Sequence, residues 1–249
     1  MMSMTEEDLN AFKRIGRIVG LTIQEMAHHL EPGITTLELD VIGRAFLDKH
    51  GARSAPELVY RFPGATCISV NDEAAHGVPG PRVVQRGDLV NIDVSAELDG
   101  YYADSGASFG VPPVAIEAQQ LLDATREALQ KALGVARAGL PIQMVGRVVE
   151  NFARDRGYTI IRNLGGHGIG RKLHQEPNFI PHHYDRTEKR RFVEGTVLTL
   201  EPFLSTGAID VTEQSDGWTL KTPNGELSAQ FEHTMIITRG KPILLTEVV

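Results

Sequence analysis

Four acidic residues stand out in this 249-residue chain because they lie in β-prone segments without a neighbouring basic partner. Asp93 and Asp104 lie on either side of Asp99-Gly100, a strong signal for a hairpin turn. Glu201 ends a third segment, and Glu232 lies in the middle of a fourth, where glutamate is unfavourable by propensity and costly if buried unpaired. As a surface residue on an edge strand, Glu232 would be unremarkable, so the four carboxylates are best considered together.

The predicted hairpin brings the two aspartates close to each other. Alternation along the first strand places Asn91 and Asp93 on one face. With a two-residue loop at 99 and 100, Asp104 falls opposite Ser95, on the face that carries Asp93. Like charges so placed repel each other, and a bound cation removes the repulsion. The alternative is a pair of solvated acids on an exposed sheet face.

A histidine in a glycine-rich segment completes the set of candidate ligands. The segment Gly165-Gly166-His167-Gly168-Ile169-Gly170 lets the backbone approach a ligand closely. It is not a phosphate loop, because neither Gly-Lys-Ser/Thr nor a GxGxxG motif before a helix is present. One imidazole among carboxylates suits Mn²⁺, Fe²⁺, Co²⁺ or Zn²⁺. Two divalent ions balance the four carboxylates, and a pair about 3.5–4 Å apart would activate a shared water.

Two pairs of helices are predicted, and the second pair repeats the first. One helix runs from Thr5 to about residue 30, and the next runs from Thr35 to Gly51. Two more are expected from about 113 to 137 and up to Gly157. Adding 106 to a number in the first half often gives a like residue: Gly33 and Gly139, Ile34 and Leu140, Ile42 and Val148, Phe46 and Phe152, and Gly51 and Gly157.

The strands repeat as well, which indicates the fold class. Segments 86–93 and 194–201 each place a glycine before a β-rich run that ends in a carboxylate. Helix pairs followed by strands in each half predict an α+β protein with helices outside a curved, mainly antiparallel sheet. We expect one catalytic domain, residues 1–249, made of two pseudo-symmetric halves.

Composition excludes several classes of function. The net charge of −7, without a long basic run, argues against a nucleic-acid-binding surface. A single cysteine, Cys67, excludes an intramolecular disulfide and fits a reducing compartment. The acidic start is not a signal peptide, and no apolar run approaches the roughly 18 residues of a membrane span. We therefore expect a cytoplasmic protein, a monomer, that binds neither nucleic acid nor a membrane.

Seven motifs, taken in order, resemble those of one known family. They are Asn71-Asp72-Glu73-Ala74-Ala75-His76-Gly77-Val78-Pro79, Asn91-Ile92-Asp93, Asp104-Ser105, Gly166-His167-Gly168-Ile169-Gly170, His174-Gln175-Glu176-Pro177, Glu201-Pro202 and Gln230-Phe231-Glu232-His233-Thr234. From about residue 5 to the C-terminus, the chain resembles the type I methionine aminopeptidases. The resemblance implies the pita-bread fold and removal of the initiator methionine from nascent polypeptides, at the ribosome, when the second residue is small.

The resemblance also implies the metal ligands and their arrangement. Five residues would hold two metal ions, with Asp104 and Glu232 bridging: Asp93, Asp104, His167, Glu201 and Glu232. Glu201 would in addition move the proton from the attacking water to the leaving amine.

Further residues would contact the substrate. His76 would contact the scissile amide or its flank, and His174 would hydrogen-bond the peptide carbonyl and stabilise the tetrahedral intermediate. Phe62, Cys67 and Trp218 would form a methionine pocket, since apolar and polarizable groups suit a thioether.

Two alternatives stay open within the same fold. A proline-specific aminopeptidase or dipeptidase usually carries a sizeable N-terminal domain, whereas here the catalytic half begins within a few residues of Met1. A non-catalytic pita-bread protein that binds peptide or RNA typically loses ligands, and all five are present. Tyr102-Ala103 and Leu173 depart from the family pattern beside the site, so the resemblance implies the reaction type but not the pocket shape or the turnover. Two histidine pairs, His28-His29 and His182-His183, are predicted to lie on the surface.

Overall fold

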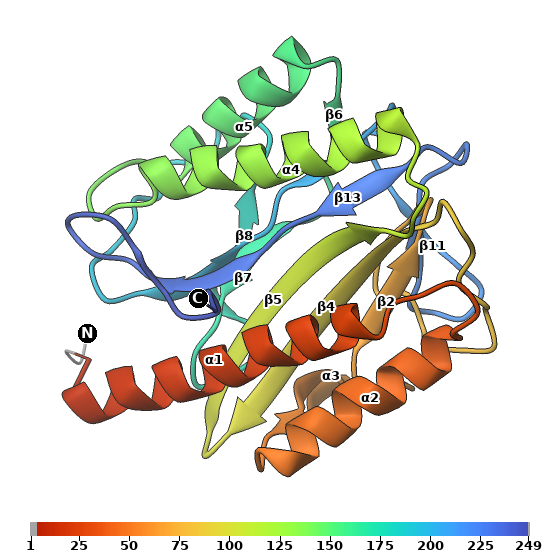
Figure 1. Ribbon diagram of the computed structural model, residues 1–249. Helices are drawn as coiled ribbons and strands as arrows, with labels where there is room; N and C mark the ends of the chain where they lie inside the picture. The colour runs from red at the N-terminus through yellow and green to blue at the C-terminus, as the bar shows by residue number, and fades with distance from the viewer. Residues whose placement is uncertain (1–3, 249) are drawn as a thin grey trace.

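Paired helices lie on the outside of the sheets in both halves of the chain (Figure 1). In this computed structural model, residues 4–248 are described, so the ends of the predicted 1–249 domain lie outside the described part. The first half carries α1 (Glu6–His28), α2 (Thr36–Lys49) and the short α3 (Ala55–Tyr60). The second half carries α4 (Ile116–Val135) and α5 (Gln143–Asp155).

The first two helices begin at the capping boxes that the sequence predicts. The amide of Asp8 donates to Oγ1 of Thr5 over 3.0 Å, and the amide of Glu38 donates to Oγ1 of Thr35 over 3.1 Å. In both boxes the carboxylate also accepts from the backbone of the cap residue. These bonds satisfy amides at the helix starts that have no partner within the helix.

The sheet of the first half is built around a long hairpin. Its strands are β1 (Arg53–Ser54), β2 (Cys67–Val70), β4 (Leu89–Leu98) and β5 (Tyr101–Gly110). β4 pairs with all three others, and every pair is antiparallel. The turn lies at Asp99-Gly100, and Ser95 faces Asp104, as predicted.

The second half contains a larger sheet of five strands. Its order is β15 (Ile243–Leu244), β14 (His233–Ile236), β9 (Val197–Leu200), β7 (Gly165–Gly168) and β8 (Gln175–Pro181). A three-stranded sheet contains β13 (Ser228–Gln230), β10 (Phe203–Ser205) and β6 (Thr159–Ile160). A second one contains β11 (Thr212–Glu213), β12 (Leu220–Lys221) and β3 (Glu73–Ala75), and so joins the two halves. All these pairings are antiparallel, which confirms the predicted α+β class.

Equivalent turns in the two halves adopt the same backbone conformation. Gly51 and Gly157, which follow α2 and α5, have φ values of 73° and 80°. Gly87 and Gly195, which precede β4 and β9, have φ values of 89° and 81°. Side chains other than glycine rarely adopt this left-handed region, so the glycines of the repeat mark corresponding positions of two similar halves.

Each half has its own hydrophobic core beneath its helix pair. Ile15 and Val19 of α1 and Leu39 of α2 are fully buried with Ile92 of β4. α4 and α5 cover the other core, which includes Leu121, Val149, Leu200 and Leu204.

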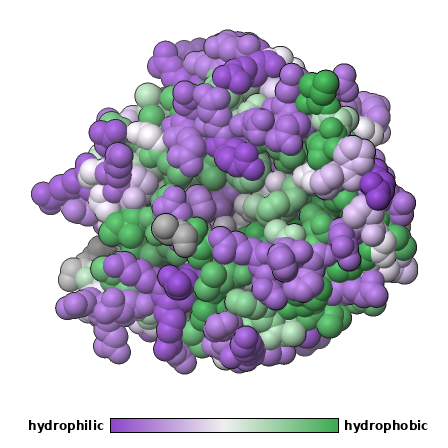
Figure 2. All heavy atoms as spheres, viewed as in Figure 1, coloured by the Kyte–Doolittle hydropathy of each residue, from purple (hydrophilic) through white to green (hydrophobic). Residues whose placement is uncertain are grey.

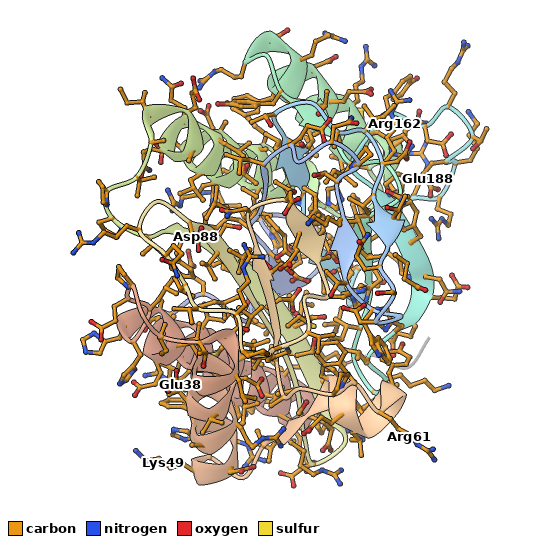
Figure 3. The ribbon with its side chains drawn as sticks, turned by 90° about the vertical axis from the view of Figure 1, so that its right-hand side faces the viewer. Glu38, Lys49, Arg61, Asp88, Arg162 and Glu188 are labelled. Carbon is orange, nitrogen blue, oxygen red and sulfur yellow. The ribbon has the colours of Figure 1, made fainter. Side chains whose placement is uncertain are left out.

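The charged side chains labelled in Figure 3 belong to both halves: Glu38 and Lys49 lie in the first half, and Arg162 and Glu188 lie in the second. No helix within residues 4–248 combines the length and the apolar composition that crossing a bilayer requires.

Candidate metal centre

The β4–β5 hairpin places Asp93 and Asp104 on neighbouring strands. Asp93 faces Gly106, and Asp104 faces Ser95, two residues further along β4. The backbone of Asp104 is tied to the second half by Thr234, whose Oγ1 accepts from the amide over 2.9 Å and donates to the carbonyl over 2.6 Å. Burial, together with the charge of Asp104, raises the pKa of Asp93 well above its usual value.

Glu201 and Glu232 approach the hairpin from the second half. Glu201 directly follows β9, and burial raises its pKa to about 8. Glu232 donates its backbone N–H to the carbonyl of Gly106 over 2.8 Å, and Ser105 Oγ donates to the Glu232 carbonyl over 2.7 Å. Burial and the charge of Asp104 raise the pKa of Glu232 well above its usual value.

One element around Glu232 differs from the prediction. The β-prone run of residues 228–237, which has Glu232 in its middle, predicts one continuous strand, but the chain forms β13 and β14 with a break at Phe231 and Glu232. β13 pairs with β10, whereas β14 pairs with β9, so the chain changes sheets at this point. The break turns the Glu232 backbone toward β5, where Gly106 and Ser105 hydrogen-bond it.

His167 of β7 presents one ring nitrogen to the carboxylates. Its Nδ1 lies 3.0 Å from the carbonyl oxygen of Gly168, which can only accept, so Nδ1 carries the proton. In the neutral ring Nε2 then carries the lone pair, and it faces Asp104 Oδ2 at 3.7 Å and Glu201 Oε1 at 3.9 Å. Burial opposes the cationic form of His167, but these two carboxylates raise its pKa.

These atoms form a set that fits a cation. Candidate ligand atoms of Asp104, His167 and Glu232 all lie within 4.8 Å of one another. Oδ1 of Asp104 and Oε1 of Glu232 are buried without a hydrogen-bond partner among the described residues. Buried polar atoms are normally hydrogen-bonded, and oxygen atoms facing an imidazole lone pair are ligands that a divalent ion accepts. The donor set thus fits the predicted metal chemistry.

His76 and His174 lie at the opening of the same site and are both exposed. Nδ1 of His174 is 2.7 Å from the hydroxyl oxygen of Tyr60, and its ring lies 4.0 Å from that of His167. Partial desolvation of the ring within the cavity and the neighbouring His167 lower the pKa of His174 to about 4, so it is neutral at pH 7. His76 has a φ of 54°, a conformation that is uncommon outside glycine and often found at functional sites.

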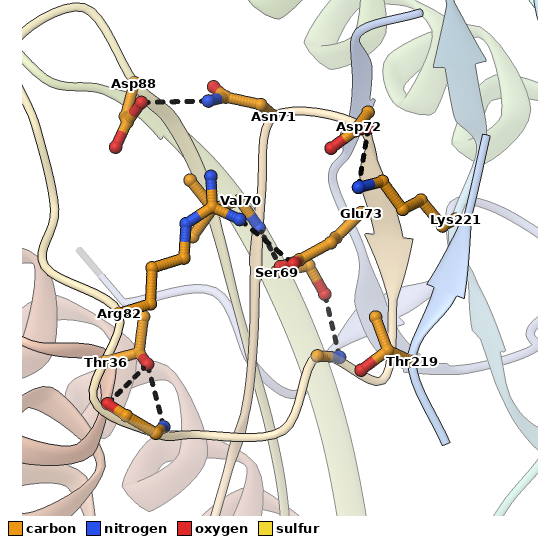
Figure 4. A network of polar contacts seen from close by, with 12 residues as sticks. Thr36, Ser69, Val70, Asn71, Asp72, Glu73, Arg82, Asp88, Thr219 and Lys221 are labelled. Carbon is orange, nitrogen blue, oxygen red and sulfur yellow. Dashed lines mark hydrogen bonds and ion pairs between the residues drawn. The ribbon is translucent and has the colours of Figure 1, made fainter. Parts of the chain in front are cut away.

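A polar network holds the segment that carries His76 (Figure 4). This segment, 71–79, is anchored at its start by three side-chain contacts to other elements. They are Asn71 to Asp88 at 2.8 Å, Asp72 to Lys221 at 2.9 Å and Glu73 to Arg82 at 3.0 Å. These contacts fix the backbone at the start of β3, three to five residues before His76.

A cavity of about 400 Å³ connects these groups. Nine of the ten residues predicted as site residues line it, and Glu232 lies in the ligand cluster. Phe62 and Trp218 pack edge to face with ring centroids 5.2 Å apart, beside Cys67 and Leu173. Figure 2, in the same view as Figure 1, shows the side on which α1, α2 and α4 lie, where apolar patches alternate with polar side chains.

The structure corrects one prediction and adds two residues. His182, expected on the surface, is buried, with 1% of its surface exposed, and its Nε2 accepts from the Glu201 amide over 3.2 Å. Its polar loop gave no periodic pattern that could reveal this burial. Gln230 lies in one of the family motifs, but the sequence assigns a site role neither to it nor to Tyr60, because their contacts with Glu201 and His174 do not follow from local spacing.

Comparison with known proteins gives consistent matches over nearly the whole chain. Residues 10–239 match Metallopeptidase family M24. A protein of Bacillus subtilis named methionine aminopeptidase 2 is 49% identical over 249 residues, which is all of both chains. The structure of methionine aminopeptidase from Rickettsia prowazekii has a TM-score of 0.94 at 33% identity and covers 99% of this chain and 100% of that one.

More distant structures share the fold alone. Prolidase from Pyrococcus furiosus has a TM-score of 0.80 at 20% identity, and the match covers 99% of this chain but 66% of the prolidase.

Proposed function

The chain belongs to metallopeptidase family M24, and from that membership we propose that it removes the initiator methionine from new polypeptides whose second residue is small. The resemblance seen in the sequence and the pita-bread fold that it implies are both confirmed. The observation that carries the proposal is that candidate ligand atoms of Asp104, His167 and Glu232 lie close together, beside a cavity that is also lined by His76 and His174. Among residues 4–248, Asp104 Oδ1 and Glu232 Oε1 are buried without a hydrogen-bond partner.

The family and the ligand cluster support the use of divalent metal. We propose two ions per chain, from among Co²⁺, Mn²⁺, Fe²⁺ and Zn²⁺, held by Asp93, Asp104, His167, Glu201 and Glu232. The four carboxylates need two divalent charges for balance, and leaving them unbalanced in a buried site is costly. Ions held here supply Lewis acidity and lower the pKa of water, so that water can attack a peptide carbonyl near neutral pH.

The side chains of this site would bind and orient the peptide and move its protons. Neutral His174 would donate a hydrogen bond from Nε2 to the scissile carbonyl oxygen, because Nδ1 is engaged with Tyr60. Glu201, whose pKa lies near neutral pH without metal, would accept a proton at its carboxylate and return it to the leaving amine. His76 would contact the amide or its flank.

Phe62, Cys67 and Trp218 would receive the methionine side chain. The T-shaped pair of Phe62 and Trp218 presents an apolar wall, and aromatic rings make favourable contacts with thioether sulfur. Leu173 in the same cavity adds a further apolar surface.

The decisive experiment compares two peptides under defined metal. Metal-free protein loaded with Mn²⁺ should cleave Met-Ala-Ser and leave an Xaa-Pro peptide intact. The reverse preference would favour the proline-specific alternative, whose structural relatives share only the fold. A folded protein that binds no Mn²⁺ or Co²⁺ and cleaves neither peptide would favour a peptide-binding role.

A second series of peptides tests the limit on the following residue. Release of methionine should occur before Gly, Ala, Ser, Thr, Cys, Pro or Val, and efficient release before Lys or Phe would contradict a confined site.

We further propose that the substrates are nascent N-termini at the ribosome in the cytoplasm, and that the protein acts as a monomer. The free, buried thiol of Cys67 supports a reducing compartment.

A further inference from the structure

Gln230, at the end of β13, lies between the two glutamates of the candidate metal centre. Its side chain is fully buried, and its Nε2 donates to Oε2 of Glu232 over 3.3 Å and lies 3.5 Å from Oε2 of Glu201. Carboxylate oxygens only accept, so the amide nitrogen is the end of Gln230 that must face them.

The other end of the amide is held independently. Oε1 of Gln230 accepts from Nδ2 of Asn91 over 2.8 Å, and the same Nδ2 lies 3.2 Å from Oγ of Ser108. Ser108 Oγ in turn accepts from the backbone N–H of Gln230 and donates to its carbonyl, both over 3.0 Å. Asn91 of β4 and Ser108 of β5 therefore fix both the backbone and the amide orientation of Gln230.

The hairpin also leaves room for this side chain. A Cβ atom at Gly106 would overlap the amide group of Gln230. Three positions of the first half, Asn91, Gly106 and Ser108, thus accommodate a residue of the second half that contacts both glutamates.

We propose that Gln230 is a positioning residue that sets the orientation of Glu201 and Glu232 for metal binding, and this rests on the proposed function. By engaging Oε2 of each glutamate, the amide directs the two Oε1 atoms away from itself. Oε1 of Glu232 is buried and has no hydrogen-bond partner within residues 4–248, and Oε1 of Glu201 faces His167 Nε2 at 3.9 Å.

A neutral donor suits this position better than a charged one. A lysine or arginine would neutralise carboxylate charge that the cations need, and a fifth acid would add repulsion. An amide donates to both carboxylates without changing the charge of the site. Groups of this kind, which orient metal ligands without touching the metal, typically change metal affinity 10–100-fold when replaced.

The test measures Mn²⁺ binding to metal-free protein by titration calorimetry. Gln230→Leu should raise the Kd for Mn²⁺ by about 10–100-fold and lower kcat for Met-Ala-Ser, while KM at saturating Mn²⁺ stays near the wild-type value. The matched control is Ser228→Ala, which alters a buried residue two positions earlier on β13 that touches no carboxylate. The control should bind Mn²⁺ as tightly as wild type.

Asn91 provides a second route to the same result. Asn91→Ala keeps every proposed ligand and keeps Gln230, yet it frees the amide to rotate, so it should also weaken Mn²⁺ binding. In the Gln230→Leu background the same substitution should have no further effect, because Asn91 acts through Gln230. This route remains informative if Gln230→Leu does not fold, as judged by circular dichroism and Tm of the metal-free protein.

Two results would overturn the inference. One is unchanged Mn²⁺ affinity in Gln230→Leu or, if that variant does not fold, in Asn91→Ala. The other is an equal loss in Ser228→Ala, which would indicate a general weakening of β13. If wild type binds Mn²⁺ but cleaves no methionyl peptide, the proposed substrate is wrong, and the affinity comparison still decides the role of Gln230.

Discussion

Removal of metal should make the stability of this protein fall as the pH rises, with Glu201 as a main cause. Its side chain is only 12% exposed, and burial raises its pKa from 4.5 to about 8. The folded state therefore holds this proton more tightly than the unfolded chain does. The stabilisation is present in full below about pH 4.5 and is lost as the pH rises through about 8.

The size of the effect follows from the same two values. Each pKa unit corresponds to about 1.4 kcal/mol, so the free energy of unfolding should fall by about 4 kcal/mol between pH 5 and pH 9 from Glu201 alone. That is a large part of the roughly 5–15 kcal/mol that stabilises a typical domain. Asp93 and Glu232 have pKa values raised by burial too and add to the loss.

The assay is urea unfolding of chelator-treated protein at pH 5 and pH 9, followed by circular dichroism. Glu201→Gln cannot ionise, so its free energy of unfolding should fall less over this range than that of wild type, by about 4 kcal/mol. Glu213→Gln, at an exposed position of β11, is the control and should follow wild type. The reasoning is refuted if wild type keeps its stability at pH 9, or if Glu201→Gln loses as much as wild type.

Three further substitutions test separate parts of the site. His174→Ala should lower kcat by about 10²–10³-fold with Mn²⁺ content unchanged, and loss of metal in elemental analysis would mean that its role is misassigned. Gly106→Ala places a Cβ against the Gln230 amide and should reduce the free energy of unfolding by about 1–3 kcal/mol in urea; an unchanged value would show that the sheet adjusts. His182→Phe leaves the Glu201 amide unpaired and should destabilise the protein by about 1–3 kcal/mol at pH 7. Burial lowers the pKa of His182 to about 3, so the stability that its neutral ring contributes should be lost from pH 6.5 down through 3, and the Tm of wild type relative to that of His182→Phe should fall over this range.

The hairpin and the repeat were predictable because they follow local rules. Side-chain alternation and a two-residue loop are enough to place Asp104 opposite Ser95, and the structure has that register. Capping boxes at Thr5 and Thr35 mark where α1 and α2 begin. None of these features depends on how the two halves meet.

The meeting of the two halves could not be derived from spacing. Ser105 and Gly106 hold the backbone of Glu232 across more than 120 positions of sequence, and the chain must change sheets at Phe231 to allow it. For these residues the family resemblance, rather than any periodicity, gave the prediction. His182 shows the reverse case, because the polar composition of its loop predicts exposure, whereas the histidine is buried and accepts from the amide of Glu201, which follows β9.

The contacts between the halves explain why metal and fold are coupled here. Asp104 is joined to Thr234, Ser105 and Gly106 are joined to Glu232, and Asn91 is joined to Gln230. All these bonds are made by backbone or uncharged groups, so they bring the carboxylates together without neutralising any of them. Burial raises the pKa values of Asp93 and Glu232, and the remaining repulsion from neighbouring carboxylates raises them further. A divalent ion removes it in the folded state alone, because only there are ligands from both halves adjacent, and so binding energy becomes folding energy.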